Sequence, residues 1–250
     1  MSALEITDLT VRYQSITALT GVSLNVKIGE MVAVVGPNGS GKSTLFKTII
    51  GLVRPTNGKI LIFGREPRTV RGRTAYVPQK EEVYWDYPLT VWDLAAMGKI
   101  KTVGILKGVP KGDRSVAEAL RAVGMEDLAE RKISDLSGGQ QQRAFLARSI
   151  VQGADLYLMD EPLAGLDADA EDKLFDVLLE LKRKGKTIIM STHDISSTLE
   201  LFDGVLLLKG RVIAYGRPRE VLTEENMKLV YGSERVAMHL GDVRRVAKWD

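Results

Sequence analysis

The chain has 250 residues with a net charge of +3; 44% of its residues are hydrophobic and 27% are charged. These values are ordinary for a globular protein with a full core, and the charge is too small to indicate nucleic acid as a partner. Cysteine is absent, which excludes disulfide frameworks and thiolate metal sites. No apolar run approaches the ~18 residues that span a bilayer, and the first residues lack the pattern of a signal peptide. We therefore expect a cytoplasmic protein that needs a partner to hold it at any membrane.

The start of the chain is expected to be rich in strands. Apolar and polar residues alternate over residues 4–13 and 22–28, which is typical of half-buried strands. Residues 59–63 and 74–78 predict two more strands, and the arginine-rich residues 65–73 between them predict a solvated loop. The strands at the start of the chain indicate an antiparallel sheet added to the core, and residues 74–78 lead to Gln79.

Residues 36–44, GPNGSGKST, follow the pattern G-x-x-x-x-G-K-[ST] of a phosphate loop. A short apolar run at residues 31–35 predicts a buried strand before it, and residues 45–50 predict a helix after it. Glycines let backbone N–H groups converge on an anion, and the positive end of the helix dipole adds to them. A glycine-rich turn that matches by chance would not explain these flanks. The chain is expected to bind a nucleoside triphosphate.

Two side chains of this phosphate loop carry the expected chemistry. Lys42 supplies a charge for the β- and γ-phosphates, and Ser43 supplies a hydroxyl for Mg²⁺. Every position of the loop is a candidate nucleotide contact, namely Gly36, Pro37, Asn38, Gly39, Ser40, Gly41, Lys42, Ser43 and Thr44.

From residue 80 to about residue 131, helical signals replace strand signals. Asp113 is expected to cap a helix that carries Val116, Leu120 and Val123 on one face. We interpret this stretch as a helical insertion, a subdomain rather than an independent domain.

A second anion site is expected at Ser137, Gly138, Gly139 and Gln140, within the sequence LSGGQ. A serine and two glycines at a helix N-terminus offer backbone N–H groups, a hydroxyl and the helix dipole. Taken alone, these residues could form an ordinary loop and cap. In a chain that already has a phosphate loop, they suggest that two copies share each nucleotide.

The α/β alternation then returns. A buried strand at residues 155–160 ends in two carboxylates, Asp160 and Glu161, at the edge where doubly wound sheets bind ligands. The alternative is a solvated acidic pair. A helix follows, then a buried strand at residues 187–191 and a hairpin over residues 205–215. This alternation predicts an α/β core with a parallel sheet.

These motifs together resemble the ATP-binding subunit of ABC transporters. The phosphate loop, LSGGQ and the strand that ends in Asp160 and Glu161 occur in the order and spacing typical of that family. The resemblance implies an α/β fold, a P-loop ABC-type nucleotide-binding domain with a mixed or parallel RecA-like core sheet, an antiparallel β subdomain and a helical insertion. The domain would cover residues 1–230, with the helical subdomain at about residues 80–135 and a tail at residues 231–250.

The resemblance also implies roles for single residues. Glu161 matches the catalytic carboxylate that polarises the attacking water, and Asp160 matches the aspartate that holds Mg²⁺. His193 resembles the switch histidine that contacts the γ-phosphate and the water. Gln79 resembles the glutamine that contacts Mg²⁺ or water and joins the core to the insertion. The catalytic set would be Glu161, His193 and Gln79, and the Mg²⁺ set would be Ser43, Gln79 and Asp160.

Two further residues would complete the nucleotide site. Asp167 matches the loop that crosses to a partner subunit. Tyr13 sits where the family places an aromatic ring that stacks on adenine, although it could be an ordinary strand tyrosine. Each ATP would lie between the phosphate loop and Tyr13 of one copy and residues 137–140 of a second copy, in a head-to-tail homodimer.

Residues 81–98 resemble the metal-importer branch of the family. The implied function is the ATP-hydrolysing subunit of an importer that powers uptake of a divalent transition metal through a separate permease. Manganese is favoured, with zinc or an iron chelate as alternatives. Tyr84, Trp85 and Tyr87 would be either anchors for the permease or part of the insertion's own core, to which Trp92 is assigned.

Such a subunit would be peripheral at the cytoplasmic face of the cell membrane. Its partners would be integral membrane permease subunits and, indirectly, an extracytoplasmic metal-binding protein, with no nucleic acid. An exporter or lipid-transport subunit is an alternative within the family. The alternative of another class is a soluble ABC ATPase acting on DNA or ribosomes; such proteins usually carry a long coiled coil, zinc cysteines or two ATPase domains, which this sequence lacks.

Overall fold

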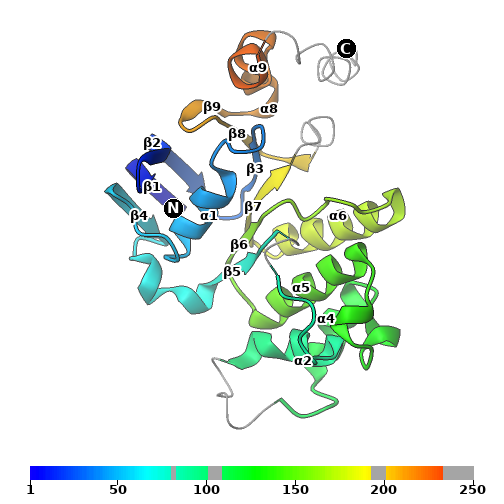
Figure 1. Ribbon diagram of the computed structural model, residues 1–250. Helices are drawn as coiled ribbons and strands as arrows, with labels where there is room; N and C mark the ends of the chain where they lie inside the picture. Colours follow the sequence, from blue (N-terminus) through cyan, green and yellow to red (C-terminus); the bar gives the residue numbers. More distant parts are fainter. Residues whose placement is uncertain (80–82, 101–108, 193–200, 233–250) are drawn as a thin grey trace. The chain divides into compact units, whose positions relative to one another are not determined.

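The computed structural model describes residues 1–79, 83–100, 109–192 and 201–232. The chain divides into two compact units, the first made of Met1–Arg71 and Thr187–Asp250 and the second of Gly72–Lys186 (Figure 1).

The first unit contains the antiparallel sheet expected at the start of the chain. Its strands are β1 (Ser2–Tyr13), β2 (Ile16–Lys27) and β4 (Asn57–Ile62), in the order β2-β1-β4. In β2, Val22, Leu24 and Val26 are buried and the residues between them are exposed. One face of this sheet therefore packs inside and the other meets water.

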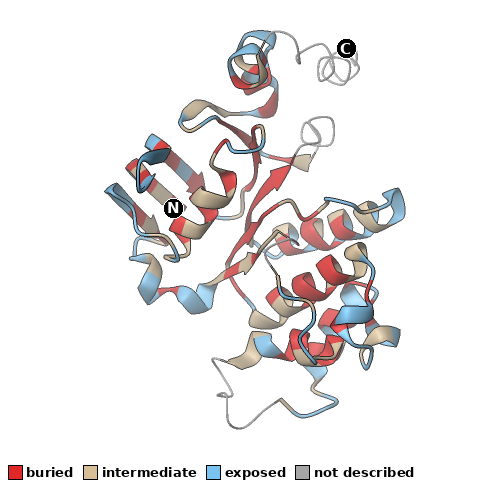
Figure 2. Ribbon diagram, viewed as in Figure 1, coloured by how far each residue is buried: buried red, intermediate tan, exposed pale blue. Residues whose placement is uncertain are grey.

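A second sheet in the first unit is mostly parallel. Its strands are β7 (Thr187–Thr192), β3 (Met31–Val35), β8 (Gly204–Leu208) and β9 (Val212–Gly216), in that spatial order. β3 pairs in parallel with β7 and β8, and β9 closes the predicted hairpin antiparallel to β8. Every residue of β3, β7 and β8 is buried (Figure 2), as continuous apolar runs indicate.

The described helices of the first unit are short. They are α1 (Lys42–Ile49), α8 (Pro218–Val221) and α9 (Glu224–Tyr231). The arginine-rich segment is exposed as expected, but it is not an irregular loop: it forms two 3₁₀ turns, Pro67–Thr69 and Arg71–Arg73. Proline favours the first position of such a turn because its φ is already fixed, and the Thr69 hydroxyl donates to the Glu66 carbonyl over 2.7 Å.

The second unit combines a pair of strands with the helical insertion. β5 (Thr74–Val77) and β6 (Leu156–Met159) pair in parallel. Its helices are α2 (Val91–Ala96), with a 3₁₀ turn at Met97–Lys99, then α4 (Arg114–Ala122), α5 (Gly138–Gln152) and α6 (Ala168–Arg183).

The predicted caps of this unit are present. Asp113 accepts hydrogen bonds from the backbone N–H groups of Ser115 and Val116, over 3.0 and 3.3 Å, at the start of α4. Helix α5 ends at Gly153 in the left-handed conformation that favours glycine. Local sequence signals therefore set where these helices start and stop.

Within the described part of the chain, no helix combines the length and the apolar character that a bilayer crossing requires.

Candidate functional site

The phosphate loop lies in the first unit, between the end of β3 and the start of α1. A Cβ atom on Gly36 would lie 2.2 Å from the Leu208 carbonyl oxygen, so only glycine fits there. Gly41 caps α1 with φ +98°, which again favours glycine. The backbone N–H of Gly210, in the β8–β9 turn, donates to the Ser40 carbonyl over 2.8 Å. The loop is thus clamped by the hairpin that follows it in the sheet.

Lys42 is buried within this loop. Its ammonium group donates to the carbonyl oxygens of Gly36 and Pro37, over 2.9 and 3.3 Å. These contacts hold the charge against the loop backbone, where a phosphate cradle needs it. The hydroxyl of Ser40 is buried and makes no hydrogen bond to another described residue.

Tyr13 stands at the tip of the β1–β2 hairpin, opposite Ile16 in the strand register. Facing residues of paired strands project from the same side, and both side chains are exposed, at 44% and 69%. The hairpin is close to the loop, because a Cβ atom on Gly41 would lie 3.0 Å from the Ala18 carbonyl. Ala18 follows Ile16 by two residues, roughly 7 Å along a strand. An exposed aromatic ring on a hairpin that approaches the phosphate loop is suited to base stacking.

The acidic pair lies in the second unit, directly after β6. Asp160 is fully buried, and its backbone N–H donates to the Val77 carbonyl over 2.9 Å. Glu161 is half-buried with φ +49°, a left-handed conformation that is rare for a residue with a side chain. Backbone strain of this kind is concentrated at functional sites.

Gln79 is brought to this acidic pair. Its side-chain amide donates to the Glu161 carboxylate over 3.3 Å. The two residues named as catalytic in this unit therefore touch each other.

The serine–glycine turn, residues 137–140, opens α5. The Ser137 hydroxyl accepts from the Gln140 backbone N–H over 3.4 Å, and the Gln140 side chain accepts from the Ser137 N–H over 3.0 Å. This is a capping box. Ser137 is exposed, and an α-helix leaves its first N–H groups without intrahelical partners. The turn is therefore both a cap and a partly exposed group of backbone donors.

Asp167 is exposed at the start of α6. Its carboxylate accepts from the Ala170 backbone N–H over 2.8 Å, so it caps that helix. A cap explains an aspartate here without any partner subunit.

The candidate residues thus form two groups, each within one unit. The phosphate loop and Tyr13 belong to the first unit, and Gln79, Asp160, Glu161, Asp167 and the serine–glycine turn belong to the second. His193, assigned as the switch histidine, lies outside the described residues.

The aromatic residues of the insertion differ in how far they are buried. Trp92 and Leu94 of α2 are buried, as expected for the insertion's own core, whereas Tyr84 and Tyr87 are 78% and 60% exposed. The Trp85 ring meets the ring of Phe145 edge to face, with centroids 5.3 Å apart. Trp85 therefore joins the aromatic segment, residues 84–87, to helix α5.

The metal-binding side chains expected from the sequence all offer oxygen atoms: the Ser43 hydroxyl, the Gln79 amide and the Asp160 carboxylate. Hard Mg²⁺ prefers oxygen ligands and usually takes only one or two carboxylates beside phosphates and water. Over the ranges that the structure covers, no three histidine, aspartate or glutamate residues gather into a metal site. Each of these oxygen atoms is of a kind that Mg²⁺ binds; Ser43 belongs to the first unit, and Gln79 and Asp160 belong to the second.

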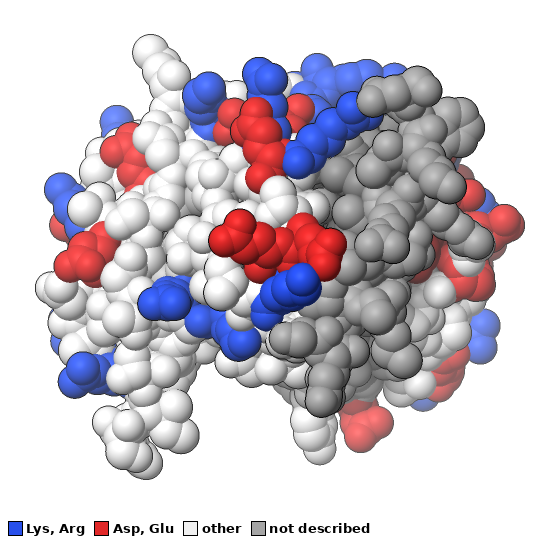
Figure 3. Space-filling model, turned by 90° about the horizontal axis from the view of Figure 1, so that it is seen from above, with Lys and Arg blue, Asp and Glu red and all other residues white. Residues whose placement is uncertain are grey.

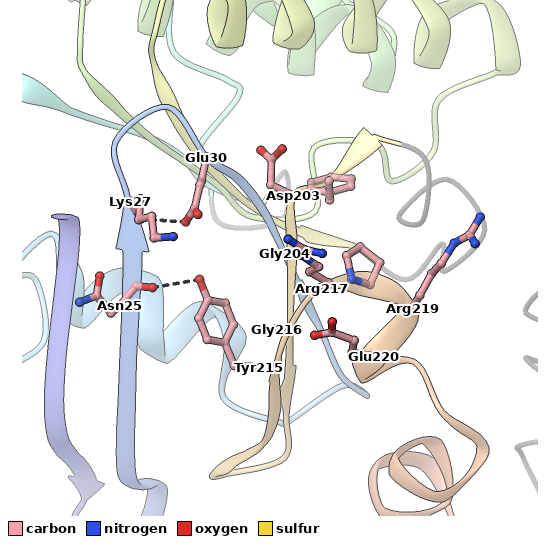
Figure 4. Close-up of a pocket in the computed structure, with 12 residues that line it drawn as sticks. Asn25, Lys27, Glu30, Asp203, Gly204, Tyr215, Gly216, Arg217, Arg219 and Glu220 are labelled. Atoms are coloured by element: carbon pink, nitrogen blue, oxygen red, sulfur yellow. Dashed lines mark hydrogen bonds between the residues drawn. The ribbon is translucent and has the colours of Figure 1, made fainter. Parts of the chain in front are cut away.

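A cavity of about 730 Å³ opens in the first unit but does not belong to the phosphate loop (Figure 4). Glu30, one of its lining residues, precedes β3, whereas the phosphate loop follows the other end of that strand. Inside, the Tyr215 hydroxyl donates to the Asn25 carbonyl over 3.0 Å, and burial raises the Tyr215 pKa to about 12. The remaining lining side chains carry both signs of charge, so they select no ligand class.

Sequence reasoning missed several contacts of the site. Ile16 at the hairpin tip and Gly210 in the β8–β9 turn were not singled out, although both follow from the predicted hairpins. Arg148 was also missed: its guanidinium donates to the Tyr76 carbonyl over 3.2 Å and lies 4.9 Å from the Phe145 ring centroid. Its only signal is a cation three residues after Phe145, on the same face of α5.

Comparison with known proteins adds independent findings. A family model described as ABC transporter matches residues 19–164, more than half of the chain. The chain is 46% identical over 233 residues to the manganese transport system ATP-binding protein MntB of Bacillus subtilis (strain 168), covering 93% of each chain. It is 45% identical over 231 residues to the zinc transport system ATP-binding protein TroB of Treponema pallidum (strain Nichols), covering 92% of this chain and 87% of that one. Among solved structures, an ATP binding subunit of an ABC transporter matches with a TM-score of 0.78 and 30% identity, covering 96% of this chain and 100% of that one.

Proposed function

This chain belongs to the ABC transporter family, and from that premise we propose that it powers import of a divalent transition metal, manganese first, through a separate permease. Membership confirms the predicted ABC-type α/β fold and the predicted ATPase activity. The observation that carries the proposal is the similarity to the manganese system's ATP-binding protein, which extends over 93% of both chains.

The choice of manganese rests on resemblance to relatives, because an ATP-binding subunit has no contact with the transported ion. The manganese and zinc relatives differ by one percentage point in identity to this chain, 46% against 45%. Zinc, or an iron chelate, therefore stays the alternative. Metal accumulation in a strain that lacks this chain decides between them.

We assign the chemistry to the side chains that the sequence motifs indicate. The phosphate loop and Lys42 bind the ATP phosphates, and Tyr13 stacks on the base. Ser43, Gln79 and Asp160 bind Mg²⁺, which supplies charge for the phosphates when bound. Glu161 and His193 orient the attacking water. Phosphoryl transfer needs positioning and charge stabilisation more than covalent chemistry, and these side chains provide both.

A second copy of the chain is proposed to complete each site. Ser137 and Asp167 are exposed, so both are accessible to a nucleotide or a partner. A Glu161→Gln variant with ATP is expected to elute as a dimer in size-exclusion chromatography. If the variant stays monomeric at saturating ATP, that result would contradict a nucleotide site shared between two copies.

The permease is proposed to bind at the aromatic segment and to hold the subunit at the cytoplasmic face of the membrane. Exposed tyrosines are typical interface anchors, and Tyr84 and Tyr87 are among the most exposed large side chains. A metal-binding protein outside the cell would deliver the ion to that permease.

The rival class is a soluble ABC ATPase that acts on DNA or ribosomes. On the face shown in Figure 3, basic and acidic side chains are interspersed, whereas nucleic-acid surfaces are usually basic over a wide area. Co-purification separates the two functions. Transport predicts capture of an integral membrane protein, whereas ATPase activity that DNA or ribosomes stimulate, with no membrane protein captured, would contradict it.

A further inference from the structure

Helix α5 is fastened to β5 by two side chains. Arg148 donates to the Tyr76 carbonyl over 3.2 Å, and Gln152 donates to the Thr74 carbonyl over 2.8 Å. Arg148 and Gln152 are one helical turn apart, about 6 Å, and alternate carbonyls on one edge of a strand are spaced about 6.6 Å apart. The two spacings match, so α5 supplies donors to two backbone carbonyls of β5.

Arg148 does more than Gln152, because it also holds an aromatic stack. Its guanidinium lies 4.9 Å from the Phe145 ring centroid, and the Trp85 ring meets Phe145 edge to face at 5.3 Å. The Arg148 side chain is partly buried, and this burial lowers the pKa of its guanidinium. A planar guanidinium can stack on a ring and donate to a carbonyl at once, whereas a lysine ammonium cannot reproduce both contacts.

Both elements that Arg148 joins end in functional groups. Helix α5 starts at the serine–glycine turn. Strand β5 leads to Gln79, which donates to Glu161. A change in the position of Trp85 can therefore be transmitted through Arg148 to both the serine–glycine turn and Gln79.

We propose that Arg148 is a positioning residue that couples the aromatic segment to the Gln79–Glu161 pair and to the serine–glycine turn. In this account Trp85, Phe145 and Arg148 move as one body, and the nucleotide state and the position of Trp85 bias each other. Such coupling is reciprocal, so ATP binding must change the surroundings of Trp85. The coupling rests on the proposed nucleotide site but not on the identity of the metal or the permease.

The test uses the fluorescence of Trp85 in the purified full-length chain. The sequence has three tryptophans, so Trp92→Phe and Trp249→Phe leave Trp85 as the only emitter. In this background MgATP is expected to shift the emission maximum of Trp85 or change its quenching by acrylamide. Adding Arg148→Lys is expected to remove at least four-fifths of that change while ATP affinity, measured by equilibrium dialysis, stays within about twofold.

The matched controls separate coupling from folding. Gln152→Ala removes the other α5–β5 hydrogen bond without touching the aromatic stack, and it is expected to keep most of the Trp85 change. Arg121→Lys alters an arginine on α4 that pairs with exposed Glu126, and it should behave like the background. Thermal unfolding of each variant identifies any that fold poorly; for those, Phe145→Leu, which breaks the same stack, replaces Arg148→Lys.

Two results would overturn the proposal. One is an unchanged Trp85 response to MgATP when Arg148 or Phe145 is replaced. The other is the absence of any Trp85 response in the background that binds ATP. Failure of ATP binding in the background would instead contradict the nucleotide site itself, which keeps the two proposals distinguishable.

Discussion

Gln79 donates its side-chain amide to the carboxylate of Glu161 over 3.3 Å, although 82 positions separate them in sequence. The contact follows from the register of the parallel pair, in which Val77 faces Met159. Each functional residue lies two positions beyond its strand's last paired residue, so both reach the same edge together. Catalytic side chains at the carboxyl ends of neighbouring strands are a consequence of parallel pairing.

Replacing Glu161 by glutamine should abolish most turnover and leave the fold intact. The amide keeps the size of the side chain and can still accept from Gln79, but it cannot polarise water as a carboxylate does. We expect the turnover number at saturating MgATP to fall by about 100-fold or more, with ATP affinity nearly unchanged. Glu118→Gln, at an exposed position of α4, is the control and should turn over normally. Near-normal turnover of Glu161→Gln would show that Glu161 is not the carboxylate that polarises the attacking water.

Replacing Gly36 by alanine should disrupt the phosphate loop. The added Cβ would lie 2.2 Å from a backbone oxygen of β8 and 2.7 Å from the Ser40 hydroxyl, so the backbone must shift. We expect a loss of stability of about 1–3 kcal/mol and ATP affinity reduced by at least tenfold, measured by calorimetry. Gly72→Ala places a Cβ with nothing within 4 Å and should change neither quantity. Equal behaviour of the two variants would contradict the close approach at Gly36.

Replacing Tyr13 by alanine should weaken binding of the base but not of the phosphates. Base–aromatic stacking is worth about 1–3 kcal/mol, which corresponds to an increase of roughly 5- to 150-fold in the dissociation constant for ATP. Tyr13→Phe keeps the ring and should bind ATP within about twofold of the wild type. Inorganic triphosphate should bind all three proteins equally. Unchanged ATP affinity of the Tyr13→Ala variant would contradict stacking on the base and would leave Tyr13 as an ordinary strand residue.

The Asp113 carboxylate should make the free energy of unfolding depend on pH in the acidic range. Hydrogen bonds from Lys99 and Ser115 lower its pKa to about 2 in the folded chain, against about 3.9 in an unfolded chain. A lowered folded pKa means that the carboxylate's contribution is complete above about pH 5 and is lost as pH falls through about 2. At pH 7 the free energy of unfolding of the wild type should exceed that of Asp113→Asn by about 1–2 kcal/mol. This difference should shrink as pH falls from about 5 to about 2. Urea unfolding at each pH measures this difference, and a pH-independent difference at Asp113 would contradict the assignment.

The sequence predicted features that depend on neighbouring residues. The caps at Asp113 and Ser137, the β8–β9 hairpin and the strand before the phosphate loop each follow from a local pattern of residue types. The alternation of strands and helices was enough for the α/β class.

The sequence alone did not predict features that depend on strand register or burial. The Gln79–Glu161 contact requires the β5–β6 register, and the left-handed φ of Glu161 has no signal because glutamate rarely adopts it. Arg148 resembles a solvent-facing arginine until the position of Phe145 is known. The short 3₁₀ turns of the arginine-rich segment carry too little pattern to separate them from a loop.

The most direct test of the central claim measures uptake of radiolabelled manganese into cells from which this chain has been deleted. Cells that regain the wild-type chain should accumulate manganese at the parental rate. Cells that receive the Glu161→Gln variant at equal abundance should accumulate about as little as the deletion strain. Equal manganese accumulation with the wild-type chain, with Glu161→Gln and without the chain would contradict ATP-driven manganese import.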